Sequence, residues 1–196
     1  MPRISEERKT ERREQILAGA RRCFAENGYE GATVARLERE IGLSRGAIFN
    51  YFPSKEDLFV ELAVRDSARM SELWVEHGLD AVVREVVELD PDWLSVYLEL
   101  FRRVRNDTEF RRRIEERNKA VIPANRARIE EAQRNGEFRD DLEAKEIGTF
   151  VNLVLNGLAL LRASDEELPS TELVLALLRD AIGPRAPRRR PSRTGV

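Results

Sequence analysis

Cysteine and histidine are almost absent from this 196-residue chain, which contains one of each. A disulfide framework, a cysteine-rich zinc module and a dithiol redox centre all need several such side chains, so these classes are excluded. Long apolar runs are scarce as well: no 18-residue apolar segment is recognised, and the charged start MPRISEERKTERRE lacks the apolar part of a signal peptide. We therefore expect a cytoplasmic protein with no membrane contact.

Strand signals are also nearly absent, because apolar residues recur at spacings of three and four instead of alternating. The chain is predicted to be all-α, and its 41% apolar residues are enough for one or two small helical domains. Four parts are expected: a flexible N-terminal arm (1–10), a helix-turn-helix domain (11–56), a C-terminal helical domain (57–184) and a disordered basic tail (185–196).

Capping residues, glycines and prolines set the expected helix boundaries. Asn27-Gly28 and Gly42 are typical helix stops, and Pro123 either kinks one long helix or divides it into two. The predicted helices span about 11–27, 33–41, 44–52, 54–76, 79–89, 91–106, 108–135, 143–163 and 170–183.

Charge is unevenly distributed along the chain, although the formal net charge is only −2. Residues 1–55 carry 11 basic and 8 acidic residues, whereas residues 56–184 carry 18 basic and 28 acidic ones. A basic head on an acidic body is expected if only one end meets a polyanion, although chance combined with a basic tail gives the same balance.

Residues Thr33 to Tyr51 carry the most specific signal. Two short helices joined by the tight turn at Gly42 match a helix-turn-helix, whose second helix enters the DNA major groove. At 100° per residue, Ile48 and Phe52 share one face of that second helix and leave the opposite face free. An ordinary helical hairpin with surface arginine and lysine is the competing interpretation.

The residues on the free face suit DNA contact. Arg45 is the candidate for bidentate guanine recognition, and small residues beside it let the backbone approach base edges. Hydroxyls at two helix starts, together with a phenol and a cation, suit phosphates. The predicted DNA-binding residues are Thr33, Ser44, Arg45, Gly46, Ala47, Phe49, Asn50, Tyr51 and Lys55.

The run ILAGARRCFAENGYEGATVARLEREIGLSRGAIFNYFPSKEDLF resembles the N-terminal domain of the TetR family of bacterial transcriptional regulators. Phe49 replaces the tyrosine that is common there, so a hydroxyl that could contact phosphate is missing. Within the family, the chain is similar to the aconitase repressors, which the later W-L-S-V-x-L-E also suggests. The resemblance rests on Gly28, Tyr29, Thr33, Gly42, Tyr51, Phe52, Lys55 and Leu58.

This resemblance implies a homodimer that binds a palindromic operator and responds to a small molecule in its C-terminal domain. The apolar pattern also favours a dimer: the helix over 170–183 is apolar nearly all round and is therefore expected to be buried on two sides. Together with the helix over 143–163, which also has a broad apolar face, it would form a four-helix bundle with the same two helices of a second subunit. A larger monomeric core is the alternative. The predicted interface residues are Phe150, Val154, Leu158, Leu161, Leu173, Leu177 and Leu178.

Polar residues on otherwise apolar faces of the C-terminal domain are candidate effector ligands: Glu99, Arg103, Asn118, Arg126, Asn152 and Asn156. No cofactor is required. If the aconitase-repressor resemblance holds, the effector is a tricarboxylate such as citrate with Mg²⁺, where Arg126 clamps carboxylate and Glu99 holds the metal. An exposed Glu99–Arg103 ion pair is the simpler explanation for those two residues.

An enzyme is disfavoured, because the sequence has no P-loop, dinucleotide fingerprint or nucleophile elbow. A helical interaction module that has lost DNA binding is the third alternative, and the presence of Tyr51 and Lys55 argues against it. The residues do not distinguish a repressor from an activator, although repression is the commoner outcome in the family.

Overall fold

The computed structural model describes residues 6–185, except for the side chains of residues 100–102. The all-α prediction is confirmed, since this range contains no strand. Its helices are α1 (Glu6–Gly31), α2 (Val34–Ile41), α3 (Arg45–Phe49), α4 (Lys55–Glu88), α5 (Pro91–Asn106), α6 (Thr108–Arg117), α7 (Val121–Arg134), α8 (Ala144–Ala163) and α9 (Thr171–Ile182).

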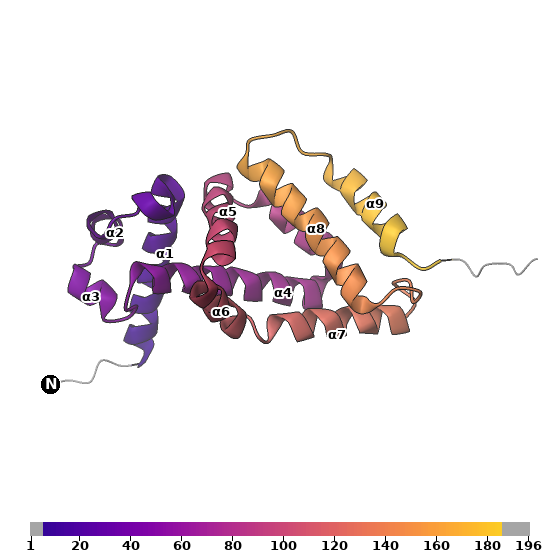
Figure 1. The fold of residues 1–196 in the computed structure, drawn as a ribbon, viewed down its shortest axis with the longest axis horizontal. Helices are drawn as coiled ribbons and strands as arrows, with labels where there is room; N and C mark the ends of the chain where they lie inside the picture. The colour runs from indigo at the N-terminus through magenta and orange to yellow at the C-terminus, as the bar shows by residue number, and fades with distance from the viewer. Residues whose placement is uncertain (1–5, 186–196) are drawn as a thin grey trace, which may run out of the picture.

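Helix α4 is the axis of the molecule (Figure 1). It leaves the α1–α3 unit at one end and continues through the larger helical body, where α5 crosses it and α7 runs along it. Helices α8 and α9 close the far side of the body. The α1–α3 unit and the body are thus joined by one continuous element.

Most of the predicted helix boundaries are confirmed by the caps that form. The Ser54 hydroxyl accepts the Asp57 N–H at 3.1 Å at the start of α4. Gly42 ends α2 in the left-handed conformation (φ 75°), a region that a residue without Cβ enters at no steric cost. The expected break between residues 76 and 79 is also present, because Gly78 has non-helical angles inside α4.

Three boundaries differ from the prediction. Helix α1 begins at Glu6, so residues 6–10 are helical instead of forming a flexible arm; acidic residues occupy its first turn, and Lys9 pairs with Glu6 at 2.7 Å. Helix α3 ends at Phe49, three residues early, in a turn before Pro53. Pro123 divides the long stretch, because it stands in the first turn of α7 where its missing N–H costs nothing.

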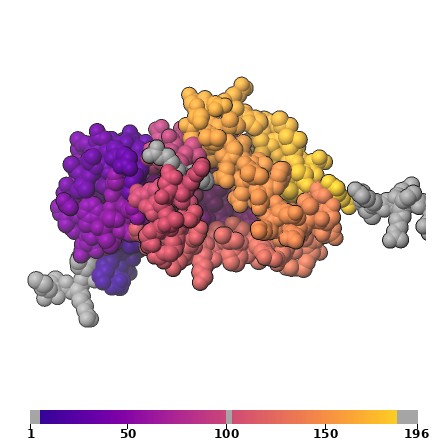
Figure 2. Space-filling view, viewed as in Figure 1, coloured from indigo at the N-terminus to yellow at the C-terminus, as the bar shows by residue number. Residues whose placement is uncertain are grey.

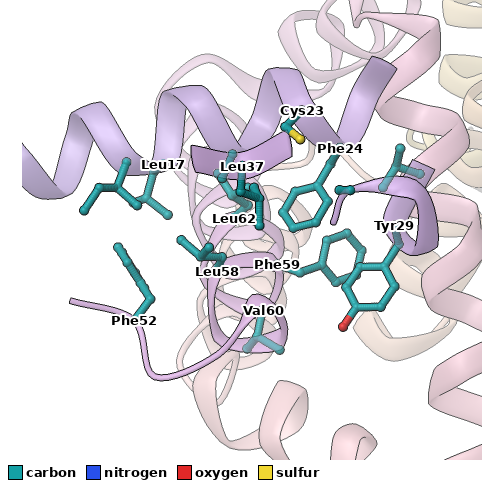
Figure 3. Packing of buried hydrophobic residues seen from close by; sticks show 14 of the residues in the cluster. Leu17, Cys23, Phe24, Tyr29, Leu37, Phe52, Leu58, Phe59, Val60 and Leu62 are labelled. Atoms are coloured by element: carbon teal, nitrogen blue, oxygen red, sulfur yellow. The ribbon is translucent and has the colours of Figure 1, made fainter. Parts of the chain in front are cut away.

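Two hydrophobic cores hold the helices together. The first combines α1–α3 and the first turns of α4, part of which Figure 3 shows around Phe24 and Phe59. Helices α5 and α6 add Trp93, Val96 and Phe110 to it. The second lies among α4, α7, α8 and α9. Since α5 and α6 contribute side chains to the first core, the α1–α3 unit does not close its own interior.

The composition of α8 bears on the expectation of no membrane contact. By length and composition alone it is apolar enough to cross a membrane, and it is the one such helix in the described range. Asn152 and Asn156 interrupt its apolar sequence, and Ile147, Val151 and Leu158 are buried in the second core. We therefore interpret α8 as a protein-packing helix. The predicted basic tail lies outside the described residues, apart from Arg185.

Candidate nucleic-acid interface

Helices α2 and α3 form the predicted helix-turn-helix at the end of the molecule away from α8 and α9 (Figure 1). The side chain of Thr33 caps α2 by accepting the Arg36 N–H at 3.4 Å. The side chain of Ser44 caps α3 in the same way, accepting the Ala47 N–H at 3.4 Å. Both hydroxyls and the helix starts around them are exposed, so phosphate oxygens can reach them.

The two faces of α3 separate as the helical periodicity predicts. Ile48 and, just beyond the helix, Phe52 are buried in the first core. Arg45, Gly46 and Asn50 are exposed on the other side, with Ala47 and Phe49 half-buried between them. Space around Gly46 is open, because nothing lies within 4 Å of the position that a Cβ would take. Their contacts with DNA stay predictions.

Tyr51 and Lys55 are less free than the sequence suggested. Tyr51 is half-buried against the first core. The Lys55 ammonium donates to the Tyr29 carbonyl at 2.8 Å and lies 4.3 Å from the centre of the Tyr29 ring. Lys55 therefore holds the last residues of α1, which follow the kink at Gly28, a role that the sequence alone did not reveal.

Tyr29 lies at the junction between the DNA-binding unit (α1–α3) and the helical body (α4–α9). Its ring lies 4.9 Å from that of Phe59 and 5.8 Å from that of Phe24 (Figure 3). Its N–H donates to the Glu99 carboxylate at 3.2 Å, and the Arg103 guanidinium lies 5.2 Å from its ring. Burial raises the pKa of the Tyr29 hydroxyl, and nearby Arg103 partly opposes that rise.

Glu99 and Arg103 therefore face the DNA-binding unit and not each other. Arg103 pairs with Glu56 in the first turn of α4, and its guanidinium lies 4.6 Å from the centre of the Phe110 ring. Glu99 and Arg103 therefore do not form the exposed i, i+4 ion pair that was the simpler explanation for them. Glu99 instead joins α5 to the end of α1, and Arg103 joins α5 to the start of α4.

Arginines from α6 extend this junction along α4. Arg113 pairs with Glu56 and Asp57, and Arg117 pairs with Glu61 at 2.7 Å. Burial on its own would raise the pKa of Glu61, but hydrogen bonds from Arg13 and other arginines outweigh it and hold that pKa below the ordinary value. Helix α6 is therefore held by ion pairs to the N-terminal end of α4, the end that follows α3 in the chain.

A cleft of about 590 Å³ opens at the junction. Its walls come from the C-terminal end of α1, from α4 and from one face of α5: Asn27, Gly28, Tyr29, Glu30, Gly31, Phe59, Glu99, Arg103 and Asn106. Two of the six predicted effector residues, Glu99 and Arg103, are thus brought together.

The other four predicted effector residues lie elsewhere. Asn118 ends α6, and its buried side-chain oxygen has no hydrogen-bond partner among the described residues. Arg126 is exposed on α7 and pairs with Glu130 at 2.7 Å, so its guanidinium is already engaged. Asn152 and Asn156 lie on the exposed side of α8. The six residues do not form a single site.

The predicted interface residues divide between two environments. Phe150, Leu173 and Leu177 are exposed, and Val154 and Leu161 are half-buried. Leu158 and Leu178 are buried in the subunit's own second core, which corrects the expectation that they meet a partner. Leu153 and Leu160, which were not predicted, are exposed on α8. A 3.6-residue periodicity identifies an apolar helix. It does not show which face packs in the subunit's own core and which face is left for a partner.

Two family models match consecutive parts of the chain. Residues 16–62 match "Bacterial regulatory proteins, tetR family", and residues 75–184 match "BetI-type transcriptional repressor, C-terminal". The first match contains the helix-turn-helix and the second contains most of the body. The chain belongs to the TetR family of bacterial transcriptional regulators.

Curated relatives narrow this assignment. The HTH-type transcriptional repressor AcnR of Corynebacterium diphtheriae is 41% identical over 184 residues, covering 93% of this chain and 97% of the relative. AcnR of Corynebacterium glutamicum is 42% identical over 176 residues, covering 88% and 93%. These matches make the chain a transcriptional repressor of this family and confirm that it is not an enzyme.

Solved structures support the fold. GusR of Salmonella enterica superposes with a TM-score of 0.71 at 22% identity, covering 91% of this chain and 98% of that structure. FadR of Bacillus halodurans gives 0.69 at 23% identity, covering 86% and 93%. The predicted architecture of a helix-turn-helix domain followed by a larger helical domain is confirmed.

The position of Lys55 generates a stability prediction. Replacing it in Lys55→Met keeps the aliphatic stem but removes the charged donor to the Tyr29 carbonyl, so the free energy of unfolding should fall by about 1–2 kcal/mol. Urea unfolding without DNA measures this, with the exposed Lys119→Met as control. Unchanged stability in Lys55→Met would contradict a structural role for the ammonium.

Proposed function

We propose that the protein represses transcription in the cytoplasm as a homodimer on an inverted-repeat operator in double-stranded DNA. A small-molecule effector bound to the C-terminal domain controls this binding. The observation that carries the DNA-binding part is the exposed row Arg45, Gly46 and Asn50 on a short helix whose opposite face is buried. That arrangement suits insertion into the major groove.

The operator proposal is tested by selecting bound DNA from a random pool with the purified protein at near-physiological salt. An inverted repeat is expected, because two α3 helices related by a twofold axis reach successive major grooves, roughly 34–36 Å apart. Arg45→Ala should weaken binding to the selected site by about 1–3 kcal/mol and relax the preference at one base pair per half-site. Equal losses on selected and random DNA would contradict base reading by Arg45.

Dimerisation through α8 and α9 is supported by the apolar side chains that the subunit leaves exposed there. Leu153 is 67% exposed, Leu177 62% and Leu160 51%. Exposed leucines at this density on adjacent helices are typical of a surface that a partner covers. Asn152 and Asn156 share the exposed side of α8, so we assign them to this interface and not to the effector.

The interface proposal predicts that Leu177→Asp yields a monomer in sedimentation equilibrium, because the new carboxylate would be buried without a partner. Because a monomer contacts only one half-site, operator binding should weaken about 100-fold or more. The matched control is Ile122→Asp, at a residue that is 75% exposed but lies on α7. If both variants remain dimers, the α8–α9 interface is wrong.

Citrate with Mg²⁺ is the effector that we propose to test first, because the curated relatives are AcnR repressors and the chain is similar to the aconitase repressors. Two buried side-chain polar atoms in the body are without hydrogen-bond partners among the described residues: the indole N–H of Trp74 and the side-chain amide oxygen of Asn118. A carboxylate suits the first, and a hydroxyl or a metal-bound water suits the second. In Figure 2, α4 forms the floor of a hollow between α5–α6 and α8.

The described residues do not fit a protein-held metal site. Among them, no group of three histidine, cysteine, aspartate or glutamate side chains could hold an ion. Glu99, the proposed metal ligand, already accepts the Tyr29 N–H. Mg²⁺ would therefore have to arrive on the ligand's own oxygens and waters, which is its usual preference.

We assign Glu99 and Arg103 a coupling role. Both residues lie on α5, a helix of the body, and each contacts the DNA-binding unit or the start of α4 next to it. An effector that displaces α5 would shift Tyr29 and Glu56 together. This shift would change the orientation of α3 relative to α3 of the second subunit. This explains how a signal in the body reaches DNA without a ligand at the DNA face.

Two readouts separate binding of the effector from coupling. Citrate with Mg²⁺ should raise the melting temperature of the wild type and change its operator affinity. Arg103→Ala should keep the thermal shift but lose most of the change in operator affinity, because the guanidinium links α5 to α4. The comparison is Arg126→Ala, which should lose the thermal shift if Arg126 clamps carboxylate. No shift in the wild type would eliminate citrate as the effector.

A further inference from the structure

Glu38 on α2 bridges both ends of the turn between α2 and α3. Its backbone carbonyl accepts the Gly42 N–H at 2.9 Å, which closes α2. Its carboxylate accepts the Arg45 N–H at 2.5 Å, which is the first N–H of α3. One residue therefore contacts the end of one helix and the beginning of the next.

Helix α3 depends strongly on such support. It has five residues, too few for a stable helix without tertiary contacts. Ile48 anchors its inner face in the first core, and the Ser44 hydroxyl caps it through a long 3.4 Å contact. The hydrogen bond to Glu38 is much shorter and has an ionised acceptor, so it is the stronger restraint on the first turn.

That first turn carries Arg45, the proposed base reader. The Arg45 side chain is exposed, and its guanidinium lies 6.0 Å from the centre of the Phe49 ring. Because the carboxylate of Glu38 holds the backbone N–H of the same residue, it fixes the point from which the guanidinium projects. A guanidinium makes its paired contact with guanine only from a narrow range of directions.

The carboxylate also has a cost. Phosphates repel an acidic group at the DNA-binding end of the molecule, and each charge there changes affinity for all sequences alike. An acidic residue at this position thus weakens binding to DNA in general while it restricts the direction of Arg45. The two effects act on different quantities, non-specific affinity and base preference, and are separable by experiment.

We propose that Glu38 is a positioning residue that sets DNA sequence specificity: its carboxylate aims Arg45 and lowers affinity for non-cognate DNA. The inference rests on the proposed operator binding by α3. It goes beyond that proposal by assigning specificity to a residue that reads no base.

The test uses the full chain and the operator obtained by selection. Affinities for the operator and for random DNA of equal length are measured for wild type, Glu38→Ala and Glu38→Gln. Glu40→Ala is the matched control, since it removes a charge from the same helix but that carboxylate pairs with Arg22 at 2.6 Å. Thermal unfolding of each variant checks that it folds.

Glu38→Ala should bind the operator about tenfold more weakly and random DNA at least as tightly as the wild type does. Its selected sites should lose preference at the base pair that Arg45→Ala affects and keep it elsewhere. The double variant should lose no more at that base pair than Arg45→Ala alone. Glu38→Gln, which keeps an acceptor, should retain the preference and bind random DNA more tightly.

The inference would be overturned by an unchanged ratio of operator to random affinity in Glu38→Ala, which equal losses from a purely structural cap would give, or by additive losses in the double variant. A Glu38→Gln variant that loses the preference as fully as Glu38→Ala would also overturn it. Failure of the wild type to prefer any site would instead refute the proposed operator binding, so the two failures are distinguishable.

Discussion

The contact of Tyr29 with the body is the interaction on which the rest of the structure depends. Its ring completes an aromatic group with Phe24 and Phe59, while its backbone N–H and carbonyl are held by Glu99 and Lys55. Buried aromatic contacts and hydrogen bonds thus meet at one residue of this junction. The two units are joined here as well as through α4 and through the first core, where Trp93 of α5 and Phe110 of α6 pack with α1.

Much of this architecture was predictable, because the relevant signals are local. Thr33, Ser44 and Ser54 each accept an N–H at the start of a helix, as their side-chain chemistry and position in the sequence predicted. Gly42 and Gly78 end or interrupt helices for an equally local reason, the conformations open to a residue without Cβ. The two faces of α3 followed from its 100° period.

Features that depend on distant residues were not predictable. The partners of Glu99 and Arg103 lie 70 and 47 residues away along the chain, so no helical pattern could identify them. Leu158 and Leu178 failed as interface residues for a related reason: a helix that is apolar all round does not reveal which side its own body covers. Lys55 was recognised as a site residue, but its contact with Tyr29 required the three-dimensional arrangement.

The open surroundings of Gly46 have an evolutionary consequence. Since no atom lies within 4 Å of its missing Cβ, and Arg45 and Asn50 are exposed, side chains on this face can change without disturbing the first core. A duplicated copy of the gene could therefore diverge towards a different operator through a few substitutions, while Ile48 and Phe52 keep the fold intact. Binding specificity and stability are encoded on opposite sides of the same short helix.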